Sequence, residues 1–202
     1  MITPVLTLAI STASPALSLA LFDADRLIAH DHRIIGRGHA EALLPAIAAL
    51  MGDARPHGII VDIGPGSFTG IRIGIAAARA LGLAWGIPVT GCTGGALVAA
   101  HAFALRPGLT AVTVLLDAGR GQLLRQHISA DFTSSPIETI APEALVVAAH
   151  QATAGPLATA GQGDRLHNSQ PDAAFALHLP PTHRSLAPAA FYVRPPDAVL
   201  PL

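Results

Sequence analysis

The sequence predicts an α/β protein built from two lobes. Three short apolar segments open the chain, and alternating strand-like and helix-like segments follow them, which is typical of an α/β sheet. The turn residues Arg106-Pro-Gly108 interrupt this pattern, and strand-like residues resume beyond them. With 202 residues, 51% of them hydrophobic and 12% charged, the chain can form a large core. We expect a first lobe over residues 1–105 and a smaller second lobe over 106–188.

The first lobe begins with a predicted meander of three strands joined by short turns. We expect these strands at residues 4–10, 16–23 and 26–34. A helix over 39–50 follows, because apolar residues recur there at helical spacing. The lobe is completed by a strand over 58–63, a helix over 69–85, a strand over 87–90 and a helix over 95–104.

The second lobe is harder to read. Strands at residues 110–117 and 121–128 open it. Beyond them we expect helices over 142–151 and 163–168, a strand over 157–160 and a connection over 178–188. No internal repeat is visible in the sequence.

A glycine-rich turn at Gly64-Pro-Gly66 leads into the helix over 69–85, and Ser67 or Thr69 can cap that helix. Small residues then recur every four positions and so share one helical face, where another backbone can approach closely. These residues are Gly70, Gly74, Ala78, Gly82 and Gly86. Helical period does not say what that face meets, so a partner protein and the chain's own sheet remain two alternatives.

The same turn does not fit a phosphate-binding loop. A P-loop needs a lysine after its last glycine, and the chain contains no lysine. A dinucleotide site needs an acidic residue to hold a ribose, and none occurs between Asp62 and Asp117. The sequence therefore favours a structural turn over a nucleotide site here.

The run Gly-Pro-Gly-Ser-Phe-Thr-Gly-Ile-Arg-Ile-Gly over 64–74, with Ile-Pro-Val-Thr-Gly over 87–91, resembles the TsaB (YeaZ) family. Further pieces agree with the family in order along the chain: Leu-Ala-Ile-Ser-Thr at 8–12, His-Ala-Glu-Ala-Leu-Leu-Pro at 39–45, Asp-Ala-Gly-Arg-Gly at 117–121 and Tyr-Val-Arg-Pro at 192–195. The resemblance is strongest over 58–91 and weak over 125–185.

This resemblance implies the actin-like, sugar-kinase and Hsp70 (ASKHA) fold, with two lobes that each hold a mixed sheet flanked by helices. It also implies that residues 189–202 return to the first lobe. By resemblance the chain is a non-catalytic scaffold and activator, the heterodimer partner of TsaD, with the ATPase TsaE joining a larger complex. The complex transfers a threonylcarbamoyl group to the adenosine beside the anticodon of tRNAs that read ANN codons.

Further expectations concern ligands and oligomers. The resemblance implies that no cofactor is bound by this chain alone, and that ATP and metal belong to TsaD and TsaE. It also allows a homodimer when the chain is alone.

In the family, the two helices of the first lobe pair with TsaD or with a second copy of the same chain. The hypothetical interface residues are His39, Glu41, Leu43, Leu44, Ile47, Ile71, Arg72, Gly74, Ile75, Ala78, Arg79 and Gly82. Arg72 and Arg79 lie seven apart and can offer guanidinium groups to a partner's carboxylates. For His39 and Glu41, a purely structural role at the start of a helix is the stronger reading.

Two rival functions are weighed against the scaffold. An active ASKHA-type ATPase or phosphotransferase would need an acidic metal ligand on its first strand, and Ser11 stands where the superfamily places an aspartate. A metal-dependent peptidase would need a paired metal site or a nucleophile with its base. His39 is followed four residues later by Leu43, so that helix offers one imidazole where the metal-binding relative has two. We expect no catalytic and no metal-binding residues.

Composition supports a soluble protein that contacts RNA mainly through a partner. A net charge of −1 and 4% aromatic residues do not form the basic, aromatic surface of a tRNA-binding protein. The single cysteine, Cys92, excludes an internal disulfide and reads as a small buried residue. No basic residue precedes Arg26, so the apolar N-terminus lacks the start of a secretion signal. We expect a cytoplasmic protein without membrane contact.

Overall fold

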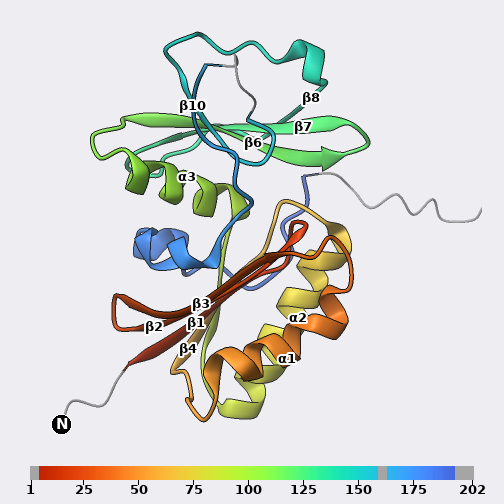
Figure 1. Cartoon of the computed structure of the whole chain (residues 1–202), viewed down its shortest axis with the longest axis vertical. Helices are drawn as coiled ribbons and strands as arrows, with labels where there is room; N and C mark the ends of the chain where they lie inside the picture. Colours follow the sequence, from red (N-terminus) through yellow and green to blue (C-terminus); the bar gives the residue numbers. More distant parts are fainter. Residues whose placement is uncertain (1–4, 159–162, 194–202) are drawn as a thin grey trace, which may run out of the picture.

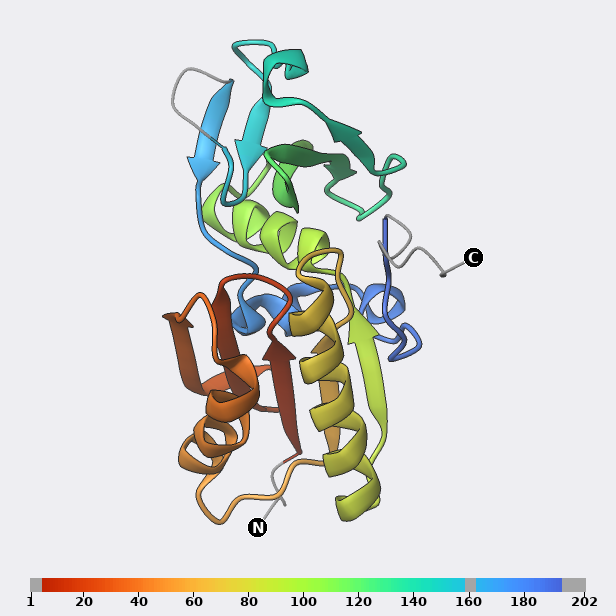
Figure 2. The same ribbon diagram turned by 90° about the vertical axis from the view of Figure 1, so that its right-hand side faces the viewer.

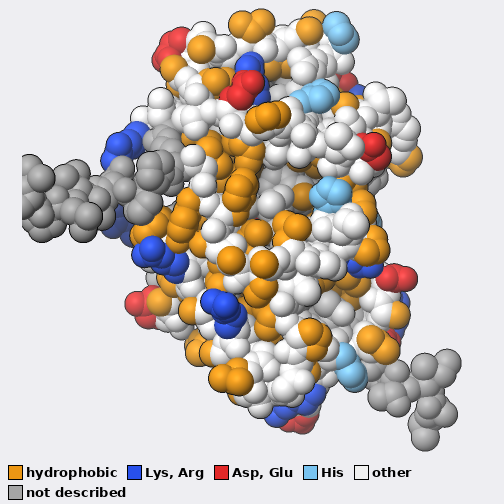
Figure 3. Space-filling view, turned by 180° about the vertical axis from the view of Figure 1, so that it is seen from behind, with side chains coloured by type: hydrophobic (Ala, Val, Ile, Leu, Met, Phe, Trp, Pro, Cys, Tyr) orange, Lys and Arg blue, Asp and Glu red, His pale blue; other side chains and the backbone are white. Residues whose placement is uncertain are grey.

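The computed structural model describes residues 5–158 and 163–193. It contains two five-stranded sheets, one in each half of the molecule, with helices outside and between them (Figure 1). Seen from behind, charged side chains are sparse and hydrophobic and neutral groups dominate the surface (Figure 3). This matches the low charge content of the sequence.

The first sheet has the strand order β3-β2-β1-β4-β5. Its antiparallel meander consists of β1 (Leu6–Ser11), β2 (Ala16–Asp23) and β3 (Arg26–Ile34). On the other side of β1, β4 (Gly58–Asp62) and β5 (Val89–Cys92) pair in parallel. The predicted elements of this lobe are all present, with ends shifted by up to two residues.

Two helices cover one face of the first sheet. They are α1 (His39–Met51) and α2 (Phe68–Trp85), which lie side by side in front of the strands in Figure 2. Ser67 is the N-cap of α2, and its side chain accepts a hydrogen bond from the Gly70 amide at 3.2 Å. Apolar residues from both helices and from the sheet form one of two cores.

The second sheet repeats the strand order of the first. In it β6 (Ala111–Gly119), β7 (Gln122–Ser129) and β8 (Glu138–Ile140) form the antiparallel part. The strands β9 (Ala152–Ala154) and β10 (Asp164–His167) pair in parallel on the other side of β6. The chain therefore contains a structural repeat in which β6 to β10 correspond to β1 to β5.

Between the two sheets lie α3 (Gly94–Leu105) and the 3₁₀ helix η2 (Ala173–His178), as Figure 1 shows. The α3 helix packs on the second sheet, η2 packs on the first, and the two contact each other. Residues 94–100 of α3 are all buried, so its apolar residues are not confined to one face there, and Val98, Ala99 and Ala100 are all at most 2% exposed. These elements form the second core.

Three predictions for the second lobe were wrong. The helix expected over 142–151 is a single 3₁₀ turn, η1 (Pro142–Ala144), followed by turns. The helix expected over 163–168 is the strand β10. The strand expected over 157–160 is absent at 157–158, while 159–160 lie outside the described residues; the actual strand is β9. Short segments carry no clear period, and here β9 forms by pairing with β6, and β10 by pairing with β9.

The segment expected to be a connection, 178–188, contains the 3₁₀ turn η3 (Pro181–His183) and then an antiparallel bridge between Leu186 and Gly91. The Phe191 amide donates to the Ile63 carbonyl at 2.9 Å, so the chain runs along the first lobe here. In the described part of the chain, no helix has the length and apolar character needed to cross a membrane.

Candidate functional site

The predicted interface residues divide between the interior and the surface of the first lobe. Eight of the twelve are buried: His39, Leu43, Ile47, Ile71, Gly74, Ile75, Ala78 and Gly82. The exposed ones are Glu41, Leu44, Arg72 and Arg79. The structure therefore places most of the hypothetical contact residues against the lobe's own sheet.

From Gly70 to Gly82 the stripe of small residues on α2 faces the chain's own sheet, which is the second of the two alternatives. Gly86 is the exposed C-cap of the helix, and a Cβ there would meet nothing within 4 Å. A Cβ added at Gly70 would lie 2.0 Å from the Thr12 carbonyl oxygen. A Cβ at Gly82 would lie 2.3 Å from Cγ2 of Val89. Glycine is needed at these positions because the helix backbone lies against the strands.

His39 points into the protein and is 7% exposed. Its Nε2 lies 3.1 Å from the Ala16 carbonyl oxygen, which ties the start of α1 to β2. The N-cap of α1 is Gly38, so His39 is neither a cap nor a solvated residue. Glu41 is exposed in the first turn of the helix, where a negative charge is favourable.

The outward surface of the two helices carries apolar and basic groups. On α2, Ala76, Arg79 and Leu83 are exposed and share one side of the helix; on α1, Leu44 and Ala48 are exposed one turn apart. We call these five residues the α1/α2 face. Leu83 is 85% exposed and Leu44 is 53% exposed, although both are large aliphatic side chains. Small alanines beside exposed leucines suit packing against another helix.

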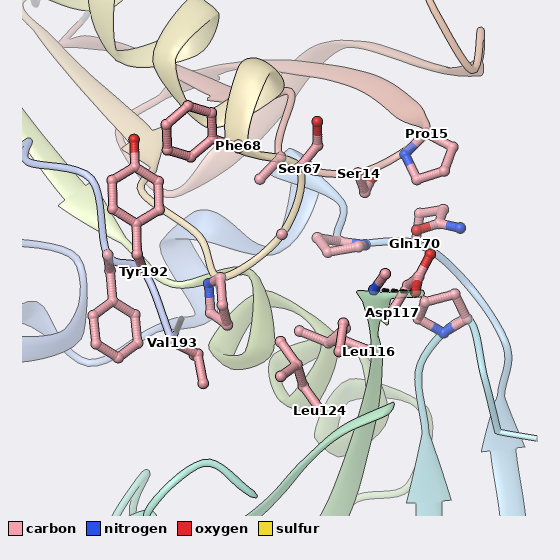
Figure 4. Close-up of a pocket in the computed structure, with 18 of the residues that line it drawn as sticks. Ser14, Pro15, Ser67, Phe68, Leu116, Asp117, Leu124, Gln170, Tyr192 and Val193 are labelled. Carbon is pink, nitrogen blue, oxygen red and sulfur yellow. Dashed lines mark hydrogen bonds between the residues drawn. The ribbon is translucent and has the colours of Figure 1, made fainter. Parts of the chain in front are cut away.

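A cavity of about 890 Å³ lies between the lobes. Figure 4 shows Ser14, Ser67 and Phe68 lining it from the first lobe, with Asp117 and Leu116 opposite. This volume is typical of a small-molecule site. Among the described residues that line the cavity, Asp117 is the only carboxylate, and its Oδ1 accepts a hydrogen bond of 2.6 Å from the Gly119 amide.

One edge of the cavity is closed by a cluster of aromatic residues around an arginine. The Arg72 guanidinium carbon lies 3.6 Å from the centroid of the Phe68 ring, and its Nε donates to the Tyr192 hydroxyl at 2.9 Å. The Phe68 and Tyr192 rings are themselves 5.0 Å apart. Arg72 is therefore engaged within the chain, while Arg79 has no hydrogen bond or ion pair within the described residues.

The carboxyl group that Ser11 contacts belongs to Asp62, which is not among the residues that line the cavity. Asp62 is 1% exposed, and its carboxylate accepts hydrogen bonds from the Ser11 hydroxyl and the Gly64 amide. Burial raises the pKa of Asp62 to about 6, despite these hydrogen bonds. Cys92 is also buried, and burial, with the nearby Asp62 charge, raises the pKa of its thiol.

Sequence reasoning missed one cluster of side chains. His30 and His32 on β3 lie beside Asp172, which precedes η2. The sequence shows the two histidines two residues apart on a predicted strand. Asp172 is 140 or more residues further along the chain, in the half whose elements are hard to predict, so the sequence does not link it to the histidines.

Together, the two lobes with the same strand order and the cavity between them define a protein of the actin, sugar-kinase and Hsp70 class. The family model described as "TsaD: tRNA N6-adenosine threonylcarbamoyltransferase" matches residues 32–190, which is more than half of the chain. The chain belongs to this family, among its TsaB (YeaZ) proteins.

Individual relatives agree with this assignment. The chain is 33% identical over 121 residues to the tRNA threonylcarbamoyladenosine biosynthesis protein TsaB of Bacillus subtilis, a match that covers 57% of this chain and 52% of the relative. It is 33% identical over 123 residues to the TsaB protein of Escherichia coli, with the same coverage. The chain thus matches about half the length of these curated relatives.

A solved structure shows the same fold over most of the chain. YeaZ from Pseudomonas aeruginosa superimposes with a TM-score of 0.72 at 24% identity, covering 88% of this chain and 90% of the other. At this identity the match supports the fold alone. The predicted fold class and the family resemblance are both confirmed.

Proposed function

We propose that this chain takes part in the synthesis of threonylcarbamoyladenosine in tRNA as a non-catalytic scaffold and activator of a TsaD protein. The observation that carries the proposal is the α1/α2 face, where two large aliphatic side chains and Arg79 are exposed on adjacent helices. By the family resemblance these two helices meet TsaD, and exposed aliphatic side chains on them suit such a contact. Family membership indicates the pathway, because two curated relatives are named for it.

The non-catalytic part of the proposal is supported by the chemistry of the cavity. Metal-dependent phosphoryl transfer needs carboxylates that reach Mg²⁺ and the phosphates. Ser11 is uncharged, Asp62 is buried behind it, and Asp117 is the one carboxylate among the described cavity residues. We therefore assign ATP and metal to TsaD and TsaE, and tRNA mainly to TsaD.

The contacts of Arg72 within the chain make it unsuitable for testing the proposed interface. Its guanidinium is already bound by Phe68 and Tyr192, so replacing it would disturb the cavity edge as well as any partner contact. Arg79 lies further along the same helix, away from these aromatic residues, and Leu83 follows it by one turn. The variants Arg79→Glu and Leu83→Asp thus test the α1/α2 face without touching the cavity.

The test is to mix the purified chain with TsaD from the same organism and measure assembly by light scattering and affinity by calorimetry. We expect a mixed complex, and each variant should weaken the affinity at least about tenfold, equivalent to about 1.4 kcal/mol. Arg165→Glu is the matched control, since Arg165 is exposed on β10 of the second lobe. Equal affinity of all variants would refute this interface.

An activity assay provides a second test of the proposed function. Threonylcarbamoyl transfer to tRNA by TsaD and TsaE should require this chain and should fall in Leu83→Asp in proportion to lost binding. Full transfer without the chain would refute the activating role. The same light-scattering experiment, run on the chain alone, distinguishes a monomer from the homodimer that the family resemblance allows.

The rival enzyme functions are tested directly on the chain alone. Because the cavity has the volume of a small-molecule site, ATP titration by calorimetry is the decisive measurement. Saturable binding of ATP with hydrolysis would favour the ATPase or phosphotransferase. Chelator-sensitive cleavage of peptides would favour the metal-dependent peptidase, and neither result is expected.

A further inference from the structure

Two histidines and an aspartate meet where the first sheet contacts the segment that returns from the second lobe. His30 and His32 are two residues apart on β3, so their side chains project from the same face of the strand. That face meets η2, whose N-cap is Asp172. Nε2 of His30 lies 2.8 Å from Oδ1 of Asp172, and Nδ1 of His32 lies 3.7 Å from the same oxygen.

The three groups are close enough to share one ion. One ligand atom from each residue lies within 4.8 Å of the others. Bonds of about 2.0–2.2 Å to zinc place two ligand atoms of a tetrahedral site roughly 3.4 Å apart. The separations of His30 Nε2 and His32 Nδ1 from Oδ1 of Asp172, 2.8 Å and 3.7 Å, lie on either side of this value. The side chains of His30, His32 and Asp172 are 33%, 22% and 14% exposed, so the site is reachable from solvent.

One of these ligand atoms lacks a hydrogen-bond partner. Nδ1 of His32 is buried and makes no hydrogen bond within the described residues. A buried polar atom without a partner costs free energy, and such atoms are rare in folded proteins. A bound cation at this point would accept the lone pair of Nδ1 and remove the cost.

Hydrogen bonds from two further residues hold Asp172 in place. Its Oδ1 accepts hydrogen bonds from the Ser18 hydroxyl at 3.0 Å and from the Ala174 amide at 2.9 Å. The Ser18 oxygen in turn accepts a hydrogen bond from the Ala173 amide at 2.9 Å. The carboxylate is therefore oriented by the protein, as a metal ligand must be.

We propose that His30, His32 and Asp172 bind a divalent transition-metal ion of the zinc type. Two imidazoles with one carboxylate suit Zn²⁺ and its neighbours in the first transition row, whereas Mg²⁺ and Ca²⁺ prefer oxygen ligands alone. Water fills the fourth position. The ion ties the edge strand β3 of the first sheet to the segment leading into η2, and so fastens the two halves of the chain together.

The test uses the whole chain without a histidine tag, stripped of metal and titrated with Zn²⁺ by calorimetry. We expect one ion per chain, and an affinity at least about 30-fold lower in both His30→Ala and His32→Ala, since each removes one of three protein ligands. His150→Ala is the matched control because His150 is exposed in the second lobe, outside the cluster. It should bind Zn²⁺ like the unaltered chain.

The visible absorption spectrum of bound Co²⁺ provides a second measurement, which reports on the ligands of the ion as well as on its affinity. Co²⁺ in a site with imidazole and carboxylate ligands gives visible absorption bands, and these should be lost in the two histidine variants. Circular dichroism checks that all variants remain folded. Zn²⁺ binding that is equal in His30→Ala, His32→Ala and the control would show adventitious binding to surface histidines and overturn the proposal, as would no binding at all. These measurements involve neither TsaD nor tRNA, so their outcome is independent of the proposed function.

Discussion

The Ser11 hydroxyl donates a hydrogen bond of 2.8 Å to Oδ2 of Asp62, although 51 residues separate them in the chain. The two residues end the adjacent parallel strands β1 and β4, and both are at most 1% exposed. The end of β1 thus carries a neutral hydroxyl, which donates to the buried carboxyl group of Asp62. This pair has a measurable effect on stability, because burial raises the pKa of Asp62 to about 6.

The raised pKa of Asp62 predicts that its contribution to stability decreases as pH rises. The native state keeps the Asp62 proton up to about pH 6, whereas in the unfolded chain the carboxyl group has its ordinary pKa of 3.8. The contribution is therefore full below pH 4 and is lost between pH 4 and 6, by about 3 kcal/mol. Asp62→Asn cannot ionise and should remove this dependence. Urea unfolding of both proteins from pH 4 to 7 tests this, and parallel profiles would contradict it.

His167 should produce the opposite dependence in an overlapping pH range. Burial, together with the neighbouring His101, lowers the pKa of His167 from 6.5 to about 4. The native state favours the neutral ring, whose Nε2 faces the Val98 carbonyl and whose Nδ1 accepts from the Ser169 amide. The contribution of the neutral His167 ring to the free energy of unfolding is therefore complete above pH 6.5. It is lost as the pH falls toward 4.

His167→Gln keeps a donor near the Val98 carbonyl but cannot take up a proton. We therefore expect it to weaken the acid-side loss of stability, so that its profile rises relative to the unaltered chain below pH 6. The dependences of Asp62 and His167 have opposite signs and similar sizes, so they largely offset each other in the unaltered chain. The unaltered chain and the double variant with Asp62→Asn should therefore both show flatter profiles between pH 4 and 6 than either single variant. If His167→Gln loses as much stability at low pH as the unaltered chain, other groups cause that loss.

The first lobe could be predicted from the sequence because its elements are long and strongly patterned. The strands β2 and β3 and the helices α1 and α2 have 8 to 18 residues each, enough for a hydrophobic period to be distinct. In the second lobe β8, β9 and β10 have only 3 or 4 residues. The structural repeat went unseen for the same reason, since short strands preserve pairing order without preserving sequence.

The candidate sites were less predictable than the fold. The helical period of α2 predicts that Gly74 and Ala78 share one face. It does not predict that Gly74 on this face meets Thr12 and Val61 of the same lobe. Likewise, His30 and Asp172 come together only because η2 returns to the first sheet from the second lobe. Long-range contacts of this kind follow from the tertiary arrangement and leave no local pattern.

Gly70 provides a test of close packing between α2 and the first sheet. In an exposed helix, replacing glycine by alanine stabilises by about 1 kcal/mol. Here the new Cβ would lie 2.0 Å from the Thr12 carbonyl oxygen, a backbone atom that cannot rotate away. We expect Gly70→Ala to lower the free energy of unfolding by at least about 2 kcal/mol. Ala80→Gly, on the exposed side of the same helix, should cost about 1 kcal/mol from helix propensity alone. Stabilisation by Gly70→Ala in urea titration would contradict the packing.

Arg72 is predicted to hold the end of the described chain against the first lobe. Its guanidinium stacks on Phe68 and donates to the Tyr192 hydroxyl, and the Phe191 amide bonds to Ile63 beside it. Arg72→Ala removes the stacking and the hydrogen bond together, each worth about 1 kcal/mol. We expect amide hydrogen exchange at residues 190–193 to become several-fold faster, with little change in the sheet strands.

Arg79→Ala is the matched control for this prediction, because it removes an exposed arginine two turns further along α2 and leaves the aromatic contact intact. Exchange at 190–193 should then stay at its original rate. Equal acceleration in both variants would mean that helix stability rather than the Arg72 contact controls the segment. No acceleration in Arg72→Ala would mean that the backbone bond to Ile63 and the Phe68–Tyr192 contact hold the segment without the arginine.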